Sequence, residues 1–472
     1  MRKIALHWQI LIALILAIIY GILFPTQYEI NKATQMKLSK KMLNIEVVEK
    51  LGELENQNFP TQKTLEEAME HKLSPAEFKT WYPTIVRASY RNEAVKAVGW
   101  MGDLFLRALK MIIIPLILSS LISGVTNIGS GSNLGRLGLK TMAYYMMTSI
   151  FAILTGLLLV NIIKPGIGAE INLSAGVEGL VDKQKSFQEI IIEIVPDNIF
   201  RAFADANMLS IIFFAILFGF FIMKVDDRPK QFLISFFNAV FDVMMKIVLF
   251  IIKFTPLGIF GIVAKVVADQ DDLLGLISSM SLYMGTVIIA LSMHAFITLP
   301  IVTRAFGKVR PWAHLKNMTT PLLTAFSTSS SGATLPLTIN AVEQQSGVSN
   351  KISSFTLPLG ATINMDGTAL YECVAAMFIA QAYGVEMSIM NQVIIVGTAL
   401  LASIGAAAIP MAGLVMITVI LSAVGLPLEG VGLILAVDRI LDMFRTSVNV
   451  WSDSCGAVII AKTEGEKLAV DI

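Results

Sequence analysis

Residues 438–453 read D-R-I-L-D-M-F-R-T-S-V-N-V-W-S-D and place ionisable side chains inside an apolar segment. Five polar residues follow one another at steps of 4, 3, 4 and 4, which puts them on one face of an α-helix: Asp438, Asp442, Arg445, Asn449 and Asp453. The flanks 433–437 and 457–461 are apolar, so this face lies within a membrane span. A charge at that depth costs about 2.5–3.5 kcal/mol, so the stripe predicts a functional site; the alternative is a ladder of internal ion pairs.

The composition also indicates a membrane protein. Of the 472 residues, 55% are hydrophobic and 15% are charged, against about 25% charged in soluble domains. The net charge of +1 gives no indication of a nucleic-acid partner. Two cysteines and four scattered histidines do not support a disulfide framework, a metal cluster or a catalytic Ser-His pair. We therefore expect neither an enzyme nor a resident cofactor.

Windows of about 20 apolar residues predict eight transmembrane helices. They lie near 6–24, 99–128, 139–163, 207–224, 232–267, 282–306, 352–384 and 429–461. Two further apolar stretches, near 318–344 and 388–427, contain small residues and proline, and we interpret them as re-entrant hairpins. A signal peptide at the N-terminus is the weaker interpretation of 1–24, because no small-residue cleavage site follows its apolar run.

Basic residues in alternate short loops predict that both termini are cytoplasmic. They are Arg2, Lys3, Arg136, Lys140, Lys224, Arg228, Lys230, Arg304, Lys308, Arg310, Lys462 and Lys467. The polar, helix-prone insert 25–98 then lies outside the cytoplasm; Ser74-Pro75-Ala76-Glu77 has the pattern of a capping box. The insert is a solvated cap or a partner-binding module. The expected organisation is a first helix 1–24, the insert 25–98, mainly scaffold helices 99–306 with a cation-site helix 139–163, a transport core 307–466 and a tail 467–472.

The two predicted hairpins have corresponding breaks. Thr328–Pro336 reads T-S-S-S-G-A-T-L-P and Ser403–Pro410 reads S-I-G-A-A-A-I-P. Each closing proline precedes a polar residue in the next span by 28 positions, Asn364 in one case (364 − 336) and Asp438 in the other (438 − 410). Such paired breaks are typical of the midplane site of a secondary transporter.

The residue types indicate the solute. Arg445 offers a planar fork for a carboxylate, and Asp442, one turn away, can hold an ammonium group. Together they fit an acidic amino acid. The hydroxyls and helix N-termini at 329–331 also suit a carboxylate.

Oxygen ligands for a hard cation gather in the same segments. Asn449 and Asp453 lie one turn apart, and the preceding span is interrupted at T-I-N-M-D-G-T-A-L-Y-E, 362–372. There Asn364, Asp366 and the unwound backbone near Gly360 and Gly367 can complete oxygen shells for sodium. Glu372, in an apolar helix, is either a proton carrier or a protonated, hydrogen-bonded bystander.

These motifs resemble the dicarboxylate/amino acid:cation symporter family, which includes animal excitatory amino-acid transporters and archaeal aspartate transporters. The matching stretches are Ser329–Pro336, Asn364–Thr368, Ser403–Gly413 and Asp438–Val450, with Y-Y-M-M-T-S at 144–149. The resemblance implies an all-α membrane protein of eight transmembrane helices and two re-entrant hairpins. It further implies a homotrimer in which each transport core moves like an elevator against a fixed scaffold, with the second hairpin as the extracellular gate.

The resemblance also implies the site residues. Arg445 would bind the side-chain carboxylate and Asp442 the amino group, and the remaining substrate residues are Asn449, Thr368, Thr446, Ser330, Ser331, Ala412 and Gly413. A first sodium ion would use Asn449 and Asp453 with backbone near Gly360 and Asn364. A second would use Thr362 with the carbonyls of Ser403, Ile404 and Ala406, and a third Tyr145, Thr148, Ser149, Asn364 and Asp366. Glu372 occupies the position of a proton-carrying glutamate in animal members.

The sequence departs from the family pattern at two positions. Ser329 and Met443 stand where archaeal and animal members respectively carry an arginine, which puts potassium counter-transport in doubt.

Two residues select the substrate by resemblance. Family carriers of neutral amino acids lack an arginine at position 445, and carriers of plain dicarboxylates lack the aspartate at 442. The expected function is thus sodium-coupled symport of glutamate or aspartate, with or without a proton, in a bacterial inner membrane. The alternatives are a C4-dicarboxylate symporter and an anion channel on the same scaffold.

Overall fold

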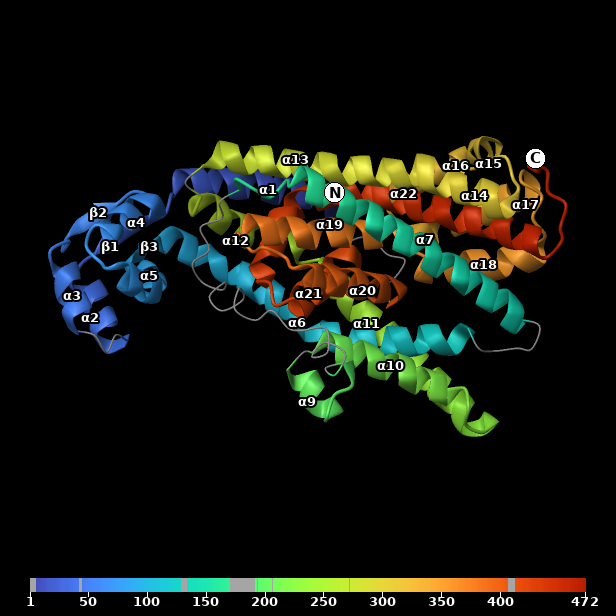
Figure 1. Ribbon diagram of the computed structural model, residues 1–472, viewed down its shortest axis with the longest axis horizontal. Coiled ribbons are helices and arrows are strands. Elements are labelled where there is room, and N and C mark those ends of the chain that lie inside the picture. The colour runs from blue at the N-terminus through green and yellow to red at the C-terminus, as the bar shows by residue number, and fades with distance from the viewer. Residues whose placement is uncertain are drawn as a thin grey trace, which may run out of the picture.

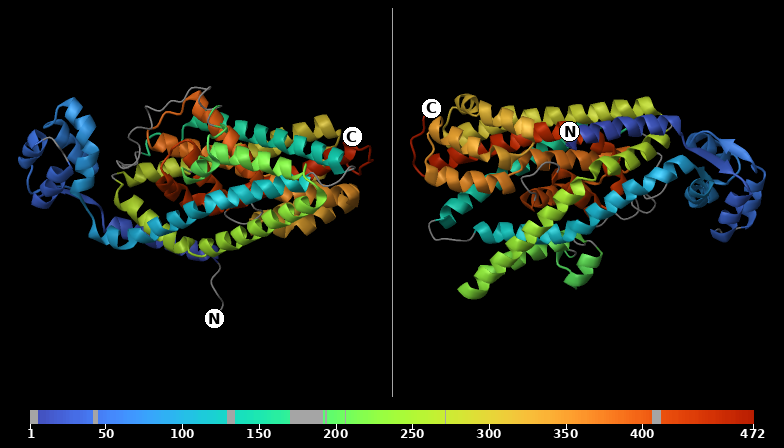
Figure 2. Two further views of the ribbon diagram at one scale, coloured as in Figure 1. Left: turned by 90° about the horizontal axis from the view of Figure 1, so that it is seen from below. Right: turned by 180° about the vertical axis from the view of Figure 1, so that it is seen from behind.

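A computed structural model describes residues 6–41, 45–128, 134–169, 192, 194–205, 207–270, 272–405 and 412–472 of this chain. Its largest part is an elongated body of helices that run roughly along the long axis of the molecule, and a smaller unit projects from one end (Figure 1). Two further views show the same division, with residues of the N-terminal fifth of the chain forming the projecting unit (Figure 2). The body therefore holds the functional residues expected from the sequence.

Helices occupy every range that the sequence predicts to span the membrane. They are α1 (Leu6–Leu23), α6 (Glu93–Ile128), α7 (Leu134–Ile163), α10 (Met208–Ile222), α11 (Asp227–Ile252) with α12 (Thr255–Ala268), α13 (Leu273–Met293) with η1 (His294–Thr298) and α14 (Leu299–Gly307), α18 (Asn350–Ile363) with α19 (Asp366–Ala382), and α22 (Val431–Thr463). Among the described helices, four are long and apolar enough to cross a membrane: 93–126, 136–163, 227–252 and 273–307. The protein is thus mainly helical, as expected.

The two stretches interpreted as hairpins are helix pairs. The first consists of α16 (Thr319–Thr328) and α17 (Ser331–Gln344), preceded by α15 (Pro311–Asn317); the second consists of α20 (Ile389–Gly405) and α21 (Ala412–Ala423). Members of each pair contact one another, and both pairs pack against the α18–α19 and α22 segments. The short helices α9 (Ile199–Ala204) and η2 (Leu428–Gly430) complete the body. The tip of the second pair, 406–411, lies outside the described residues.

The long predicted span 232–267 is divided into two helices in the structure. Helix α11 ends at Ile252, and α12 begins at Thr255 with Pro256 in its first turn, where the missing N–H of proline costs no hydrogen bond. Two residues later Gly258 packs directly against the ring of Phe105 on α6, a contact that leaves no room for a side chain. The break therefore sets α12 tightly against α6.

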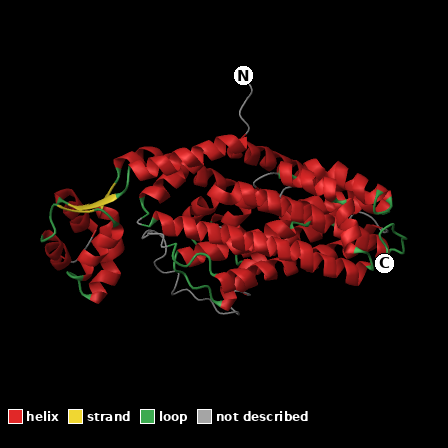
Figure 3. Cartoon of the chain, turned by 90° about the horizontal axis from the view of Figure 1, so that it is seen from above, coloured by secondary structure: helices red, strands yellow, loops and turns green. Residues whose placement is uncertain are grey.

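The insert has its own core and contains strands that the sequence analysis missed. Its helices are α2 (Lys32–Lys41), α3 (Ile45–Gly52), α4 (Gln62–Glu70) and α5 (Pro75–Ser89), around an antiparallel sheet in the order β2 (Gln57–Phe59), β1 (Gln27–Ile30), β3 (Tyr90–Arg91). The strands of the described chain lie in this unit (Figure 3). Two to four residues are too few for a strand period to be recognised, so the all-helical expectation was wrong here.

The capping box predicted at Ser74 is present. The Ser74 hydroxyl accepts a hydrogen bond from the backbone N–H of Glu77, and Glu77 Oε2 accepts one from the backbone N–H of Ser74 at 2.9 Å. Donation from that backbone N–H, helped by Lys50, lowers the pKa of Glu77 to about 2. The carboxylate therefore stays ionised and keeps the start of α5 in place at any ordinary pH.

The insert is attached at one narrow base. Strands β1 and β3 pair with Gln27 opposite Arg91 and Tyr28 opposite Tyr90, so the chain enters and leaves side by side. At this base Asp269, just after α12, accepts hydrogen bonds from the hydroxyls of Thr26 at 2.5 Å and Tyr90 at 3.1 Å. Burial and the nearby Asp269 carboxylate raise the pKa of Tyr90, so its hydroxyl remains a donor.

This attachment predicts that the insert can be removed. Replacing residues 29–89 by Asn-Gly joins Tyr28 to Tyr90 through a two-residue hairpin turn and leaves the bonds to Asp269 intact. We expect the shortened protein to elute as a single species in detergent, with a Tm within about 5 °C of the full chain. Aggregation of the shortened chain in size-exclusion chromatography would show that the body needs the insert to fold.

The residues after α22 are more ordered than a free tail. The backbone N–H of Arg310 donates to the carbonyl of Val470 at 2.9 Å, and Lys462 pairs with Asp471 at 2.6 Å. At the same end Glu464 pairs with Arg136 and Lys140 of α7, each at 2.6 Å, and these cations lower the pKa of Glu464. The end of the chain thus fastens α22 to α7 and to the start of α15.

Candidate transport site

The polar stripe of α22 is buried in the middle of the helical body. The Arg445 side chain is 1% exposed, and its Nη2 lies 2.9 Å from Asp442 Oδ1 and 3.2 Å from Asp438 Oδ1. Its Nε donates to Asp442 Oδ1 at 3.0 Å. Two carboxylates therefore pair with one buried guanidinium. This arrangement agrees in part with the alternative interpretation of the stripe as a ladder of internal ion pairs.

A tyrosine that the sequence analysis did not single out completes this cluster. Tyr371 on α19 is fully buried; its hydroxyl donates to Asp438 Oδ1 at 2.6 Å, and its ring lies 4.1 Å from the guanidinium carbon of Arg445. The ring face of Tyr371 attracts the guanidinium cation. Only the packing of α19 on α22 brings these residues together, so no local pattern indicated the pair.

The second helix pair closes over the guanidinium. At the start of α21, Gly413 comes so near Arg445 that a β-carbon there would lie 2.7 Å from Nη1. Nη1 is buried and has no hydrogen-bond partner within the described parts of the chain. Of Ala412 only the backbone is described, as the first residue of α21. Arg445 Nη1 can thus donate to an acceptor that binds beside the second helix pair.

The break between α18 and α19 faces the same stripe. Asn449 Oδ1 accepts the backbone N–H groups of Gly367 at 2.8 Å and Thr368 at 3.4 Å, and its Nδ2 donates to Thr368 Oγ1 at 3.0 Å. A β-carbon at Gly367 would lie 2.5 Å from the carbonyl oxygen of Arg445, so only glycine fits between the two helices. The predicted grouping of Asn449 with Thr368 is therefore present.

One turn further along α22, carboxylate and amide oxygens converge on the last turn of α18. Asn364 Nδ2 donates to Asp453 Oδ1 at 2.9 Å and to Ser452 Oγ at 3.0 Å. A β-carbon at Gly360 would lie 2.5 Å from Asp453 Oδ1 and 2.7 Å from the Tyr145 hydroxyl. The predicted cation residues Gly360, Asn364 and Asp453 thus lie together in a buried polar cluster.

The third predicted cation group is also assembled. Asp366 is fully buried, and its Oδ1 accepts the hydroxyls of Ser149 at 2.6 Å and Thr148 at 3.3 Å. Thr148 also lies 3.4 Å from Asn364 Oδ1, which joins the two groups. Tyr145 is buried beside them, with its hydroxyl donating to the carbonyl of Thr356 at 2.7 Å.

Among the described residues, no hydrogen bond joins Thr362 to Ser403, two of the residues expected to form a second sodium site. Thr362 is exposed, and its hydroxyl donates to the carbonyl of Leu359, whereas the Ser403 hydroxyl donates to the carbonyl of Leu400. The side chain of Ile404 and all of Ala406 lie outside the described residues. Each hydroxyl therefore bonds to its own helix.

The remaining predicted residues with described side chains belong to α17, α19 and α22. Ser330 caps α17 by accepting the backbone N–H of Ala333 at 3.2 Å, and Ser331 and Thr446 are buried. Glu372 on α19 is fully buried, and neither of its oxygens has a hydrogen-bond partner in the described structure. Glu372 was considered as a protonated bystander held by hydrogen bonds, and the described structure shows no such bond to its carboxyl oxygens.

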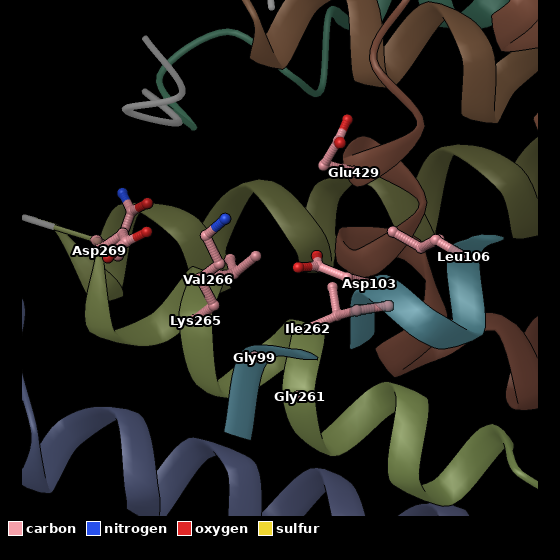
Figure 4. A pocket seen from close by; sticks show the side chains of 10 residues that line it. Gly99, Asp103, Leu106, Gly261, Ile262, Lys265, Val266, Asp269 and Glu429 are labelled. Carbon is pink, nitrogen blue, oxygen red and sulfur yellow. The ribbon is translucent and has the colours of Figure 1, made fainter. Parts of the chain in front are cut away.

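A cavity at the insert end of the body is separate from these residues. It lies between α6, α12 and η2, where Asp103, Lys265 and Glu429 line the opening together with the end of α12 (Figure 4). No residue of the Arg445 or Asp366 groups contributes to it. The buried polar stripe, rather than this cavity, is the candidate site.

Apolar helices that enclose a buried, charged and glycine-lined site at helix breaks are typical of membrane transport proteins. The model of the sodium:dicarboxylate symporter family matches residues 6–463, nearly the whole chain. The chain therefore belongs to this family.

Several characterised proteins are similar to the chain over most of its length. Excitatory amino acid transporter 3 of Mus musculus is 37% identical over 417 residues, covering 78% of this chain and 79% of the relative. The proton/sodium-glutamate symport protein of Bacillus subtilis (strain 168) is 37% identical over 372 residues, covering 77% and 86%. An excitatory amino acid transporter of Caenorhabditis elegans is 36% identical over 409 residues, covering 77% and 80%.

Proposed function

We propose that this protein is a sodium-coupled symporter of an acidic amino acid, glutamate or aspartate. The observation that carries the proposal is the buried Arg445–Asp442 pair, whose guanidinium keeps one arm, Nη1, without a partner among the described residues. A solute with both a carboxylate and an ammonium group can bond to both members of such a pair. The names of the similar mouse and Bacillus proteins agree with such a substrate.

In the proposed binding mode, Arg445 Nη1 takes the side-chain carboxylate beside Gly413, and Asp442 takes the amino group. Asn449 and Thr368, already hydrogen-bonded to each other at the start of α19, hold the α-carboxylate. Ser330, Ser331, Thr446 and the backbone at Ala412 surround the solute. The positive end of the α19 dipole points towards this carboxylate and favours it.

Sodium would bind where buried oxygens converge and, within the described ranges, no lysine or arginine pairs with them. One site uses Asp453, Asn449 and the backbone at Gly360 and Asn364; another uses Asp366 with Thr148, Ser149 and Tyr145. A site at Thr362, Ser403, Ile404 and Ala406 would form between α18 and the second helix pair, whose helix α20 contacts α18. Glu372 would carry a proton, because it is fully buried and its two oxygens have no hydrogen-bond partner among the described residues, so both remain available.

The transport cycle that we propose follows the family resemblance. Eight helices or helix pairs span the bilayer with both termini in the cytoplasm, and the pairs α16–α17 and α20–α21 re-enter from opposite sides. The transport core 307–466 moves against the mainly scaffold helices of 99–306, which include the cation-site helix α7, within a homotrimer in a bacterial inner membrane. Apolar side chains exposed on α1 and α11 support lipid-facing surfaces, among them Ile12, Ile15, Ile19, Phe232, Phe236 and Phe250.

Uptake into proteoliposomes tests the proposal. We expect labelled aspartate or glutamate to accumulate above its external concentration when an inward sodium gradient is present, and to equilibrate without accumulation when choline replaces sodium. Labelled succinate is run in parallel. Accumulation of succinate but not of the amino acids would identify a C4-dicarboxylate symporter, and equilibration independent of sodium would identify a channel.

A further inference from the structure

A fully buried histidine contacts the Asp366 carboxylate from a helix that the predicted site did not include. His294 Nε2 lies 3.1 Å from Asp366 Oδ2, and both side chains are 0% exposed. The same oxygen accepts the hydroxyl of Ser452 at 2.6 Å. An ionised carboxylate only accepts hydrogen bonds, so with the Asp366 carboxylate in that form the imidazole donates its Nε2–H.

The backbone at His294 has the local geometry needed for this contact. Residues His294–Thr298 form a π-helical turn, in which the N–H of Leu299 donates to the carbonyl of His294 five residues back. Pro300, which has no N–H, follows at once in α14. The widened turn leaves the carbonyl of Ala295 to accept Trp451 Nε1 at 3.0 Å. Such turns are rare and occur frequently at functional sites.

The four donors divide the Asp366 carboxylate into two sides. Oδ1 accepts Ser149 and Thr148, the residues of the proposed cation site, while Oδ2 accepts Ser452 and His294. A donor on Oδ2 fixes the carboxyl plane and supports its negative charge in a dry interior. Oδ1 is thereby held towards the cation site before a cation arrives.

We propose that His294 is a positioning residue for the Asp366 cation site, acting through the Nε2–H donor that orients the carboxylate. This inference rests on the proposed sodium coupling. In this proposal His294 itself binds neither the cation nor the solute. Residues that orient the ligands of a metal ion through hydrogen bonds commonly affect the affinity of the site.

The test compares donor and non-donor side chains at position 294. His294→Leu should raise the sodium concentration for half-maximal uptake about tenfold or more, because a hydrogen bond to a charged group is worth roughly that factor or above. The KM for the amino acid at saturating sodium should change less than threefold. His294→Gln, which can place an amide donor near Oδ2, should recover most of the loss. Equal sodium dependence in wild type and His294→Leu would overturn the proposal.

A second measurement avoids transport altogether. The Tm of the purified protein is recorded against sodium concentration, since a bound ion stabilises the folded state by mass action. His294→Leu should shift this titration to higher sodium, and His294→Gln should not. If His294→Leu does not fold, His294→Met, with a flexible side chain and no N–H donor, replaces it in the same comparison.

Another buried histidine supplies the matched control. His314 contacts Ser346 Oγ at 2.8 Å and Ser454 Oγ at 3.2 Å and stacks on Trp451, but it does not reach Asp366. His314→Leu should lower the Tm without moving the sodium titration, and an equal sodium shift in both variants would overturn the proposal. If neither the uptake nor the Tm of the wild type depends on sodium, the proposed function itself is wrong. This result differs from a failure of the His294 proposal alone, in which the wild type still responds to sodium.

Discussion

Replacing Arg445 by cysteine is expected to abolish the uptake of acidic amino acids and to allow that of neutral ones. The guanidinium is the buried cation of the cluster, and its Nη1 is the arm proposed for the side-chain carboxylate. Without it, a carboxylate entering the site would lie unpaired near Asp438 and Asp442, which repel it. We expect uptake of aspartate to fall at least a hundredfold, measured in proteoliposomes with an inward sodium gradient, beside labelled serine and alanine.

The companion variant Asp442→Asn separates the two symporter hypotheses. If Asp442 holds an ammonium group, the neutral amide weakens the binding of amino acids, and their uptake falls at least tenfold. If the solute is a plain dicarboxylate, transport of succinate survives the same change. Unchanged aspartate uptake in Arg445→Cys would contradict the assignment of the site, whatever the result with Asp442→Asn.

The second large effect is expected from adding one methyl group at Gly360. A β-carbon there would lie 2.5 Å from Asp453 Oδ1 and 2.7 Å from the Tyr145 hydroxyl, both closer than real β-carbons approach oxygen. Gly360→Ala must therefore displace Asp453 or Tyr145 from the proposed cation pocket. We expect the sodium concentration for half-maximal uptake to rise more than tenfold, or sodium-driven uptake to disappear.

Gly397→Ala is the matched control. Gly397 lies within α20, where a β-carbon would meet no atom within 4 Å, and alanine favours a helix over glycine by about 1 kcal/mol. Its sodium dependence should equal that of wild type. Normal sodium coupling in Gly360→Ala, in protein whose Tm is unchanged, would contradict a cation site at this position.

Much of the fold could be predicted because a bilayer allows few solutions. Long apolar runs must be helices, since backbone groups in lipid can only pair within a helix or a closed barrel. The predicted spans therefore coincide with helices in the structure, and Pro256 marks a true break. The strands β1 and β3 escaped prediction because their pairing joins residues about 60 positions apart, which no local pattern reveals.

One buried face shared by Asp438, Asp442, Arg445, Asn449 and Asp453 follows from the amino-acid sequence alone, because helical periodicity is local and charge is costly in lipid. The partners of that face depend on how the helices pack. Tyr371 under the guanidinium and His294 on the Asp366 carboxylate come from other helices, and distant contacts leave no periodic trace in the sequence. An ionisable residue within the apolar 282–306 span was the one signal that pointed to His294.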